Sequence, residues 1–535
     1  MNLNKLLFLL FLSGSVVAQD IGTTKVKVLE GYKPAIPEAV KLNENANFED
    51  TLKKDRVQVY EFIDVDLESE YTTKPLTVAK VKNEKITDLY SNKVSASLGS
   101  AWISRASLVY NSCRSNNFSY GLMADHFSNR YYFAKNSDNH ISLYTKKIGS
   151  SNIFVSNLFY ERKTSLYYDD KSNLEDKFFR NRYAYTKFSF SASSNKVIDN
   201  TLKHHTVFFI SDLNELSENQ IHFRSNLRKK ISGVPVVLDV RFDNYMRYNN
   251  IDSNLGNRYF RSLYCSPNTS FSRFGIDFDL GIDIDLRSNS SASFFPVFQL
   301  TKELVEDVLL INGGLRHKKK NNSLKSLSDV NPYVHSFGTN QSILRDSIIL
   351  QQLKVTDIHD WFLYMRNILG WQDVLELGIA YGKVQNFTHF IPFDYLDYNR
   401  FQAVYLDVNQ LHICARYSRR INEIMSLDAE VDYFNWNKTV YYSPHLTSNL
   451  SVFINLREKV RAKPSISYMG RRFITDQDLT GLPSQIHVNL ELYYLYSKQL
   501  SAYLELNNLS NSKQDMWLGY REIGFHVVFG MNFSF

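Results

Sequence analysis

Apolar and polar residues alternate with a period of two along much of the chain from residue 93 onward. In the segment 274–286, every even-numbered position is Phe, Ile or Leu. The odd-numbered positions of this segment carry four aspartates: Asp277, Asp279, Asp283 and Asp285. Because successive side chains of a strand point to opposite faces, such a segment predicts a strand with one apolar and one polar face. The segments 486–496 and 525–535 show the same pattern.

The length of these segments favours a membrane protein. Strands of soluble proteins have about five or six residues, whereas a tilted transmembrane strand needs roughly 9–11. A sheet in a membrane has to close, because no unpaired edge can face hydrocarbon. We therefore predict an all-β fold, a transmembrane antiparallel β-barrel over residues 93–535, with about 18 strands in a range of about 14 to 22. A soluble or surface-exposed all-β protein is the alternative.

The polar faces of the strands would line the lumen of this barrel. Beside the four aspartates, six basic residues fall on polar faces: Arg224, Arg228, Arg241, Arg416, Arg461 and Lys463. Rings of lumenal charge set solute selectivity in pores, which makes these ten residues candidates for lining a pathway. Alternatively, charges of both signs pair across strands and fill the interior. Same-face residues of one strand are about 7 Å apart, too far for one ion at the acidic stripe unless the side chains converge. We assign no metal-ligating residue, and we expect no cofactor.

The first residues predict export. Lys5 is the only charge before the apolar run from Leu6 to Leu12, and small residues precede Gln19. This is the layout of a secretory signal peptide, which we assign to residues 1–18. Residues 19–92 contain only two glycines and many charges of both signs. We expect them to form an extended or partly disordered periplasmic tail, or a short plug of the barrel.

Composition narrows the possible classes. Past the signal peptide, no run of 18 or more apolar residues occurs, which excludes a transmembrane helix there. The 37 Phe and 34 Tyr suit the aromatic girdles of a membrane barrel. A net charge of +7 is mild for 535 residues, so we expect no nucleic-acid partner. Three cysteines, Cys113, Cys265 and Cys414, make no disulfide framework.

Known catalytic patterns are missing. The sequence contains no G-x-S-x-G elbow, no H-E-x-x-H and no G-x-x-x-x-G-K. The nearest clusters are Asp357 with His359 and Asp360, and the pair His204–His205. We interpret both as structural residues at loops or strand ends, and we expect no enzyme.

The last fifty or so residues carry a resemblance to a family. The residues that carry it are Asn508-Leu509, Trp517, Gly519-Tyr520, Gly530 and the final Phe535. This stretch resembles the two C-terminal strands of TonB-dependent receptor barrels. The low-Gly, Lys/Asn/Ile/Tyr-rich composition of the chain is similar to that of Bacteroidetes-type Gram-negative proteins. The resemblance implies that the outer-membrane barrel assembly machinery reads the last strand, with these residues as its signal: Phe525, Phe529, Phe533 and Phe535.

The N-terminal part departs from that family. A receptor of this kind has a Gly-rich plug of well over a hundred residues and 22 strands, whereas residues 19–92 are too few and too Gly-poor for a full plug. We therefore expect a barrel in outer-membrane lipid that takes part in uptake or passage of a small solute, with its tail in the periplasm, where a TonB-like or other partner would bind it. The alternative function is a non-transporting accessory subunit of an outer-membrane complex, with the tail docking a periplasmic partner.

Overall fold

The computed structural model describes these residues: 90–112, 117–131, 134–167, 180–195, 201–214, 217–247, 259–288, 290–334, 353–370, 372–393, 400–474 and 481–535. The expected signal peptide, and the expected tail up to residue 89, lie outside them. The first strand begins at Asn92, next to the predicted barrel start at residue 93.

Twenty-two strands form one antiparallel sheet. Their bounds are β1 Asn92–Gly99, β2 Ile103–Asn111, β3 Phe118–Tyr131, β4 Ala134–Ile148, β5 Asn152–Tyr167, β6 Arg180–Ser194, β7 Lys203–Asn214, β8 Glu218–Ile231, β9 Val234–Arg247, β10 Tyr259–Arg273, β11 Ile276–Arg287, β12 Ser290–Val305, β13 Leu309–Asn321, β14 Val355–Ile368, β15 Asp373–Phe393, β16 Arg400–Arg420, β17 Met425–Trp436, β18 Leu446–Leu456, β19 Val460–Met469, β20 Gln485–Leu495, β21 Leu500–Asn507 and β24 His526–Ser534. A separate two-stranded hairpin consists of β22 Asp515–Trp517 and β23 Tyr520–Arg521.

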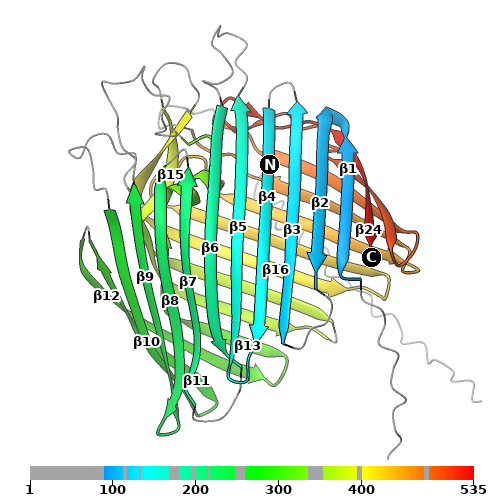
Figure 1. Ribbon diagram of the computed structural model, residues 1–535. Helices are drawn as coiled ribbons and strands as arrows, with labels where there is room; N and C mark the ends of the chain where they lie inside the picture. Colours follow the sequence, from blue (N-terminus) through cyan, green and yellow to red (C-terminus); the bar gives the residue numbers. More distant parts are fainter. Residues whose placement is uncertain are drawn as a thin grey trace, which may run out of the picture. The chain divides into compact units, whose positions relative to one another are not determined.

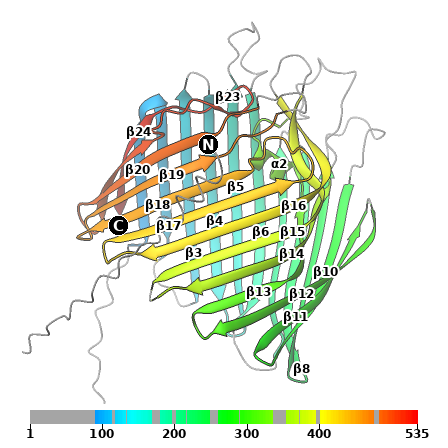
Figure 2. The same cartoon turned by 180° about the vertical axis from the view of Figure 1, so that it is seen from behind.

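The sheet closes on itself through its first and last strands (Figures 1 and 2). Strand β24 pairs with β21 on one side and with β1 on the other, in a register that runs from Lys93↔Ser534 to Gly99↔Val528. The prediction of an all-β, antiparallel barrel is confirmed. The space for a tight seam comes partly from Gly530, because a Cβ there would lie 2.2 Å from the Tyr503 ring.

The predicted number of about 18 strands is wrong: the barrel has 22, the upper limit of the predicted range. The estimate assumed too much chain per strand, because many turns are tight. The segment Leu315 to Asp329 is rich in basic and polar residues, which suggests a polar loop, but the structure differs. Residues up to Asn321 belong to β13, and Leu324–Val330 form the short helix α2.

The two ends of the barrel differ in their connections. The strand ends joined by the five longest connections all lie at one end, which we call the long-loop end; these connections are residues 168–179, 248–258, 322–354, 470–484 and 508–525. At the opposite, short-turn end, neighbouring strands are joined by tight turns such as Ser232-Gly233, where both residues have positive φ. Strand β1 begins and β24 finishes at the short-turn end.

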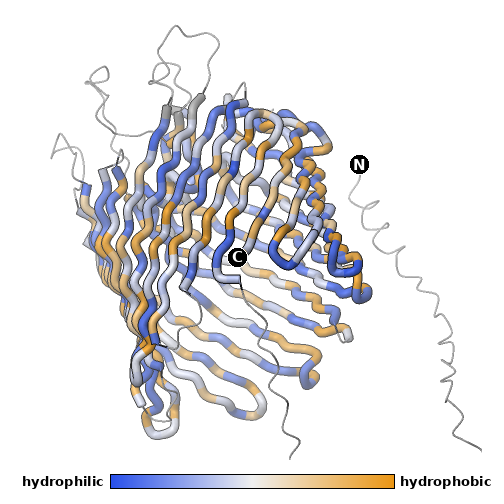
Figure 3. Tube along the Cα trace, turned by 45° about the vertical axis from the view of Figure 1, so that its right-hand side comes forward, coloured by the Kyte–Doolittle hydropathy of each residue, from blue (hydrophilic) through white to orange (hydrophobic). Residues whose placement is uncertain are grey.

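The outer face of the wall is apolar. Apolar and polar residues alternate along the strands in Figure 3, and one member of each alternation is exposed, as at Leu363 (52%), Ile379 (44%) and Ile413 (40%). A wall that exposes large apolar side chains strand after strand is the outer surface of a membrane barrel. Among the described residues, no helix is long and apolar enough to cross a membrane.

Candidate functional site

The ten charged residues predicted to line the lumen all lie on strand faces opposite the exposed apolar side chains. On β11, for example, Leu280 and Ile282 are exposed, whereas Asp283 and Asp285 are 3% and 0% exposed. The same alternation places the basic candidates of β8, β9, β16 and β19 on the inner face. Contact of these residues with a solute stays a prediction.

Several of the ten are engaged by a cross-strand partner of opposite charge. Arg224 donates two hydrogen bonds to Asp239, at 3.0 and 2.8 Å, and Arg416 lies 2.7 Å from a Glu430 oxygen. Lys463 is more loosely placed, 3.9 Å from Glu491.

Three further candidates contact a residue close by. Arg241 lies 3.5 Å from Asp239, the carboxylate that also accepts from Arg224. Arg228 donates to the Asn226 side chain at 3.0 Å, and Asp277 accepts a hydrogen bond from Ser272. Of these contacts, only the pairs of Arg224, Arg416 and Lys463 join opposite charges across neighbouring strands, as the alternative interpretation of the charges expects.

The barrel wall divides between β12 and β13. Within the described residues, these strands pair only from Phe298↔Leu315 toward the short-turn end. Beyond Leu315, β13 still pairs with β14 as far as Asn321, and the other half of β12 still pairs with β11. The two halves of the sheet therefore separate toward the long-loop end.

Past the division, β13 and β14 lie inside the wall. On β14, Trp361 and Leu363 are exposed like other outer-face residues, but Asp357, on the same face of the strand, is 1% exposed. Asp357 is buried because it packs against the inner face of β8–β11. We call residues 316–321 and 355–360 the inner layer and strands β8–β11 the outer layer.

Ionic contacts hold the two layers together around Asp285. Lys319 of the inner layer lies 2.8 Å from one oxygen of Asp285. Arg287, on the same strand as Asp285, contacts its other oxygen and reaches across to Asp357 at 2.6 Å. Since these carboxylates are almost fully buried, each one needs its cationic partner, because an unpaired buried charge is strongly destabilising.

A second group of contacts lies beside the first. The His317 ring is 1% exposed, with one ring nitrogen 2.9 Å from Asp283 and the other 3.2 Å from Asp357. The Asn321 amide donates to Asp243 at 3.0 Å. The interface between the layers is therefore polar and ion-paired, as a barrel interior is. The side chains that the inner layer contributes lie on the face of β13 and β14 that is the outer face elsewhere along these strands.

The helix α2, between β13 and β14, is anchored to the inner face of the wall. The buried carboxylate of Glu218, at the start of β8, accepts from the backbone N–H groups of Leu324 and Lys325, at 2.8 and 3.3 Å. Ser323 caps the same helix end by accepting from the Ser326 N–H. The Lys325 ammonium lies 2.8 Å from Glu161 of β5.

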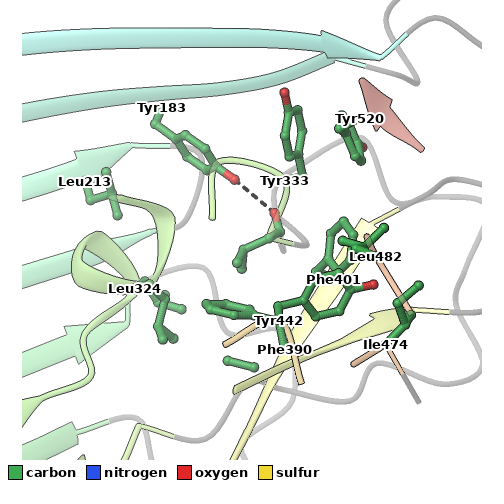
Figure 4. Close-up of a cluster of buried hydrophobic side chains, with 13 residues drawn as sticks. Tyr183, Leu213, Leu324, Tyr333, Phe390, Phe401, Tyr442, Ile474, Leu482 and Tyr520 are labelled. Carbon is green, nitrogen blue, oxygen red and sulfur yellow. Dashed lines mark hydrogen bonds between the residues drawn. The ribbon is translucent and has the colours of Figure 1, made fainter. Parts of the chain in front are cut away.

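Apolar side chains continue this anchor across the long-loop end (Figure 4). Leu324 and Leu327 of α2 are 1% and 2% exposed, and the cluster they join is Tyr183, Leu213, Leu324, Leu327, Tyr333, Val334, Phe390, Phe401, Ala403, Tyr442, Ile474, Leu482 and Tyr520. Its members come from β6 and β7 on one side and from β15, β16 and three connections on the other.

Hydrogen bonds to backbone carbonyls hold Tyr333 and Val334 between the two sides of this cluster. The Tyr183 hydroxyl donates to the carbonyl of Val334 at 2.9 Å, and the Phe401 N–H donates to the carbonyl of Tyr333 at 3.1 Å. Burial raises the pKa of the Tyr333 phenol to about 12. The segment 322–334 therefore ties β6–β8 to β16 and occupies the space between them.

Cavities lie among the inner faces of the described strands, and we describe two of them. One, of about 440 Å³, is lined by polar residues of β2–β4, including Arg105, Asp125 and His140. The other, of about 310 Å³, lies over β17–β20 and is closed on one side by Met516 and Glu522 from the β21–β24 connection. Both cavities combine charged and apolar lining, as binding sites for small molecules do.

A group of three potential metal ligands borders the second cavity. His412, Cys414 and Asp432 each offer one ligand atom, and these atoms all lie within 4.8 Å of one another. Asp432 also lines the cavity. Neither Cys414 nor His412 stands out in the sequence, because Cys414 and Asp432 become cross-strand partners only once the turn between β16 and β17 is placed.

The inner layer also contains residues that the sequence analysis missed. His317 and Lys319 lie in a basic run that suggested a loop, because residues 316–320 are basic at successive positions and show no alternation that would indicate an inner face. Asp357 and Asp360 were expected at a loop or strand end, but they lie within β14. Asp360 accepts two hydrogen bonds from Arg316, at 2.6 and 2.9 Å, which gives it a structural partner.

The fold and these sites define the class of protein: a closed 22-stranded membrane-type β-barrel with a polar interior. Solved structures give this class a closer description. The chain is similar to the ferric-catecholate import receptor Fiu from E. coli K12, with a TM-score of 0.58, 11% identity, and 84% and 82% of the two chains covered. These values show a shared fold.

Two further receptors give the same result. A mutant ferric enterobactin receptor PfeA from Pseudomonas aeruginosa, in complex with enterobactin, has a TM-score of 0.62 and 12% identity, with 83% of this chain and 81% of that chain covered. The siderophore receptor PirA from Acinetobacter baumannii has a TM-score of 0.60 and 12% identity, with 84% and 81% covered. The barrel thus has the fold of these siderophore receptors. No protein-family model and no curated protein matches the sequence.

Proposed function

We propose that this chain is an outer-membrane barrel that takes part in gated uptake of a small solute. The observation that carries the proposal is the closed 22-stranded wall, apolar outside and polar inside, with the fold of receptors that import ferric siderophores. A metal complex of the siderophore type is the first candidate solute. The lumenal charges predicted from the sequence would contact it, with Arg461 and Lys463 among the more exposed of them.

The ends of the barrel suggest its orientation. In outer-membrane barrels, short turns face the periplasm and longer loops face the exterior. By this rule the segment 322–334 lies at the outer end, where it would act as the gate. Strand β1 then begins on the periplasmic side, so residues 19–92 would lie in the periplasm. There they would bind a TonB-like partner, or they would fill the lumen as a short plug in place of a full plug domain.

A second candidate function is an accessory subunit of an outer-membrane complex. The filled interface between the layers and the aromatic cluster at the long-loop end support it, because both reduce the open interior. In this case the tail would dock a periplasmic partner and no solute would pass.

Single-channel conductance in planar bilayers separates the two functions. We would compare the full-length protein with a variant lacking residues 19–89, and verify by heat-modifiable migration that both are folded. Gated uptake predicts brief or rare openings in the full-length protein and more frequent openings without the tail. If both folded proteins remain silent, and vesicles containing them exclude the siderophore, the transport proposal is wrong and the accessory function is favoured.

A further inference from the structure

We propose that His412, Cys414 and Asp432 form a binding site for a divalent cation of the zinc type on the inner wall of the barrel. The proposal goes beyond solute uptake, because a cation can bind here whether or not a solute passes. It rests on the convergence of three different ligand types from two neighbouring strands.

The register of β16 and β17 brings the three side chains together. Cys414 and Asp432 are direct cross-strand partners, and His412 lies two residues from Cys414 on the same face. The outer-face neighbours Ile413 and Val431 are exposed, so the three ligands point to the inner face. One potential ligand atom from each residue lies within 4.8 Å of the others, close enough for one ion after small side-chain rotations.

The neighbours of the three residues hold them in place. The His412 ring stacks on Phe434 with centroids 4.3 Å apart and an angle of 5° between the rings. Its Nε2 atom lies 2.8 Å from Asp432 Oδ1. Cys414 faces Gly378 on the other neighbouring strand, where an added Cβ would lie 2.6 Å from the Cys414 sulfur. The glycine therefore leaves the space that the thiol occupies.

The ligand types indicate the class of ion. Thiolate, imidazole and carboxylate are the ligands of Zn²⁺, whereas Ca²⁺ and Mg²⁺ prefer sites made of oxygen. A thiolate and a carboxylate together balance the charge of a divalent cation. Arg416, two residues beyond Cys414, is paired with Glu430 at 2.7 Å, which reduces its repulsion of a cation.

The fourth coordination position would face the cavity of about 310 Å³ that Asp432 lines. Three protein ligands and one open position are typical of zinc sites that bind water or an added ligand. The same cavity is lined by Met469, His487 and Met516, whose sulfur and nitrogen atoms also suit a borderline-soft cation. An ion here would therefore be accessible to a small ligand from the lumen.

Cobalt(II) titration of the full-length protein tests the site. Co²⁺ occupies zinc sites and produces a near-ultraviolet charge-transfer band only when a thiolate coordinates it. We expect this band in the wild type and its loss when Zn²⁺ is added in competition. Cys414→Ser should abolish the band, and His412→Ala or Asp432→Asn should weaken Co²⁺ binding about tenfold or more.

Cys265→Ser and Cys113→Ser are the matched controls. Cys265 lies on β10, away from the site, and Cys113 lies outside the described residues, so both variants should keep the band. As a second measurement, Zn²⁺ should slow alkylation of Cys414 in the otherwise unchanged Cys113→Ser/Cys265→Ser protein. A folded wild type without the band, or a Cys414→Ser protein that keeps it, would show that His412 and Asp432 form only a hydrogen bond. Neither readout involves conductance, so the test of the cation site is independent of transport.

Discussion

At the scale of single residues, Asp285 shows why the division of the wall is stable. Its carboxylate is 0% exposed and contacts both Arg287 of its own strand and Lys319 of the inner layer. A buried ion pair gives little net stability, but removal of one partner leaves a charge without compensation. Asp279, on the same face of β11, is only partly buried.

Asp285→Asn should therefore lower the free energy of unfolding by about 3–5 kcal/mol, because Lys319 and Arg287 would lose their common counter-charge inside the protein. Asp279→Asn is the control and should change it by less than about 1 kcal/mol. Urea titration of the barrel in lipid vesicles measures both. Equal effects of the two substitutions would mean that the contacts between the layers do not stabilise the barrel.

At the scale of elements, α2 is the piece of chain that would control access. Its N-terminal end is held by Glu218, and its apolar side is buried among residues of β6, β7 and β16. A helix of seven residues has little stability of its own, so tertiary contacts keep it folded. Loss of those contacts should release the whole segment rather than a single side chain.

Leu327→Asp places a charge in this buried position and should detach α2 from the wall. We expect faster protease cleavage within residues 322–334 and at least tenfold more channel openings in bilayers, since about 1.4 kcal/mol already changes an equilibrium tenfold. Val330→Asp is the matched control, because Val330 belongs to the same helix and is 49% exposed. Faster cleavage without added conductance would mean that the segment does not gate the barrel.

At the scale of the whole molecule, closure depends on one seam. Strand β24 joins β21 to β1, and the Phe535 backbone exchanges two hydrogen bonds of 3.0 Å with Asn92. Four phenylalanines of this region, Phe525, Phe529, Phe533 and Phe535, are 48%, 54%, 45% and 49% exposed, as outer-face residues are. Their role as an assembly signal is still a prediction from the resemblance.

Phe535→Ala tests that role in cells. If the assembly machinery reads this residue, the amount of heat-modifiable barrel in the outer membrane should fall about tenfold. Leu456→Ala removes a side chain with similar exposure at the short-turn end of β18 and should leave that amount unchanged. Undiminished barrel in the Phe535→Ala strain would contradict the assignment.

Sequence reasoning succeeded where a local pattern decides the structure. The alternation in 274–286 indicates β11 and its polar face without reference to any other part of the chain. It failed at β13, because the successive charges from Arg316 to Lys320 suggest a loop and not a strand with one face toward lipid. The burial of His317 and Lys319 depends on Asp283 and Asp285, which belong to another strand.

The site at Cys414 was missed for a similar reason. Which residue of β17 lies beside Cys414 depends on the turn between the strands, and a shift of one residue would move Asp432 to the outer face. The number of strands likewise depends on turn lengths, which the alternation does not determine. Contacts between layers and register across turns are properties of the folded sheet.

The division between β12 and β13 affects how the barrel can change its width. Backbone hydrogen bonds between the two strands already end at Phe298 and Leu315, so the layers beyond that point are joined through side chains. Sliding the inner layer away from β8–β11 would lengthen the perimeter at the long-loop end without breaking any bond of the β-ladder there. The wall can therefore widen at this end, and the charged side chains between its layers set the free energy that the widening requires.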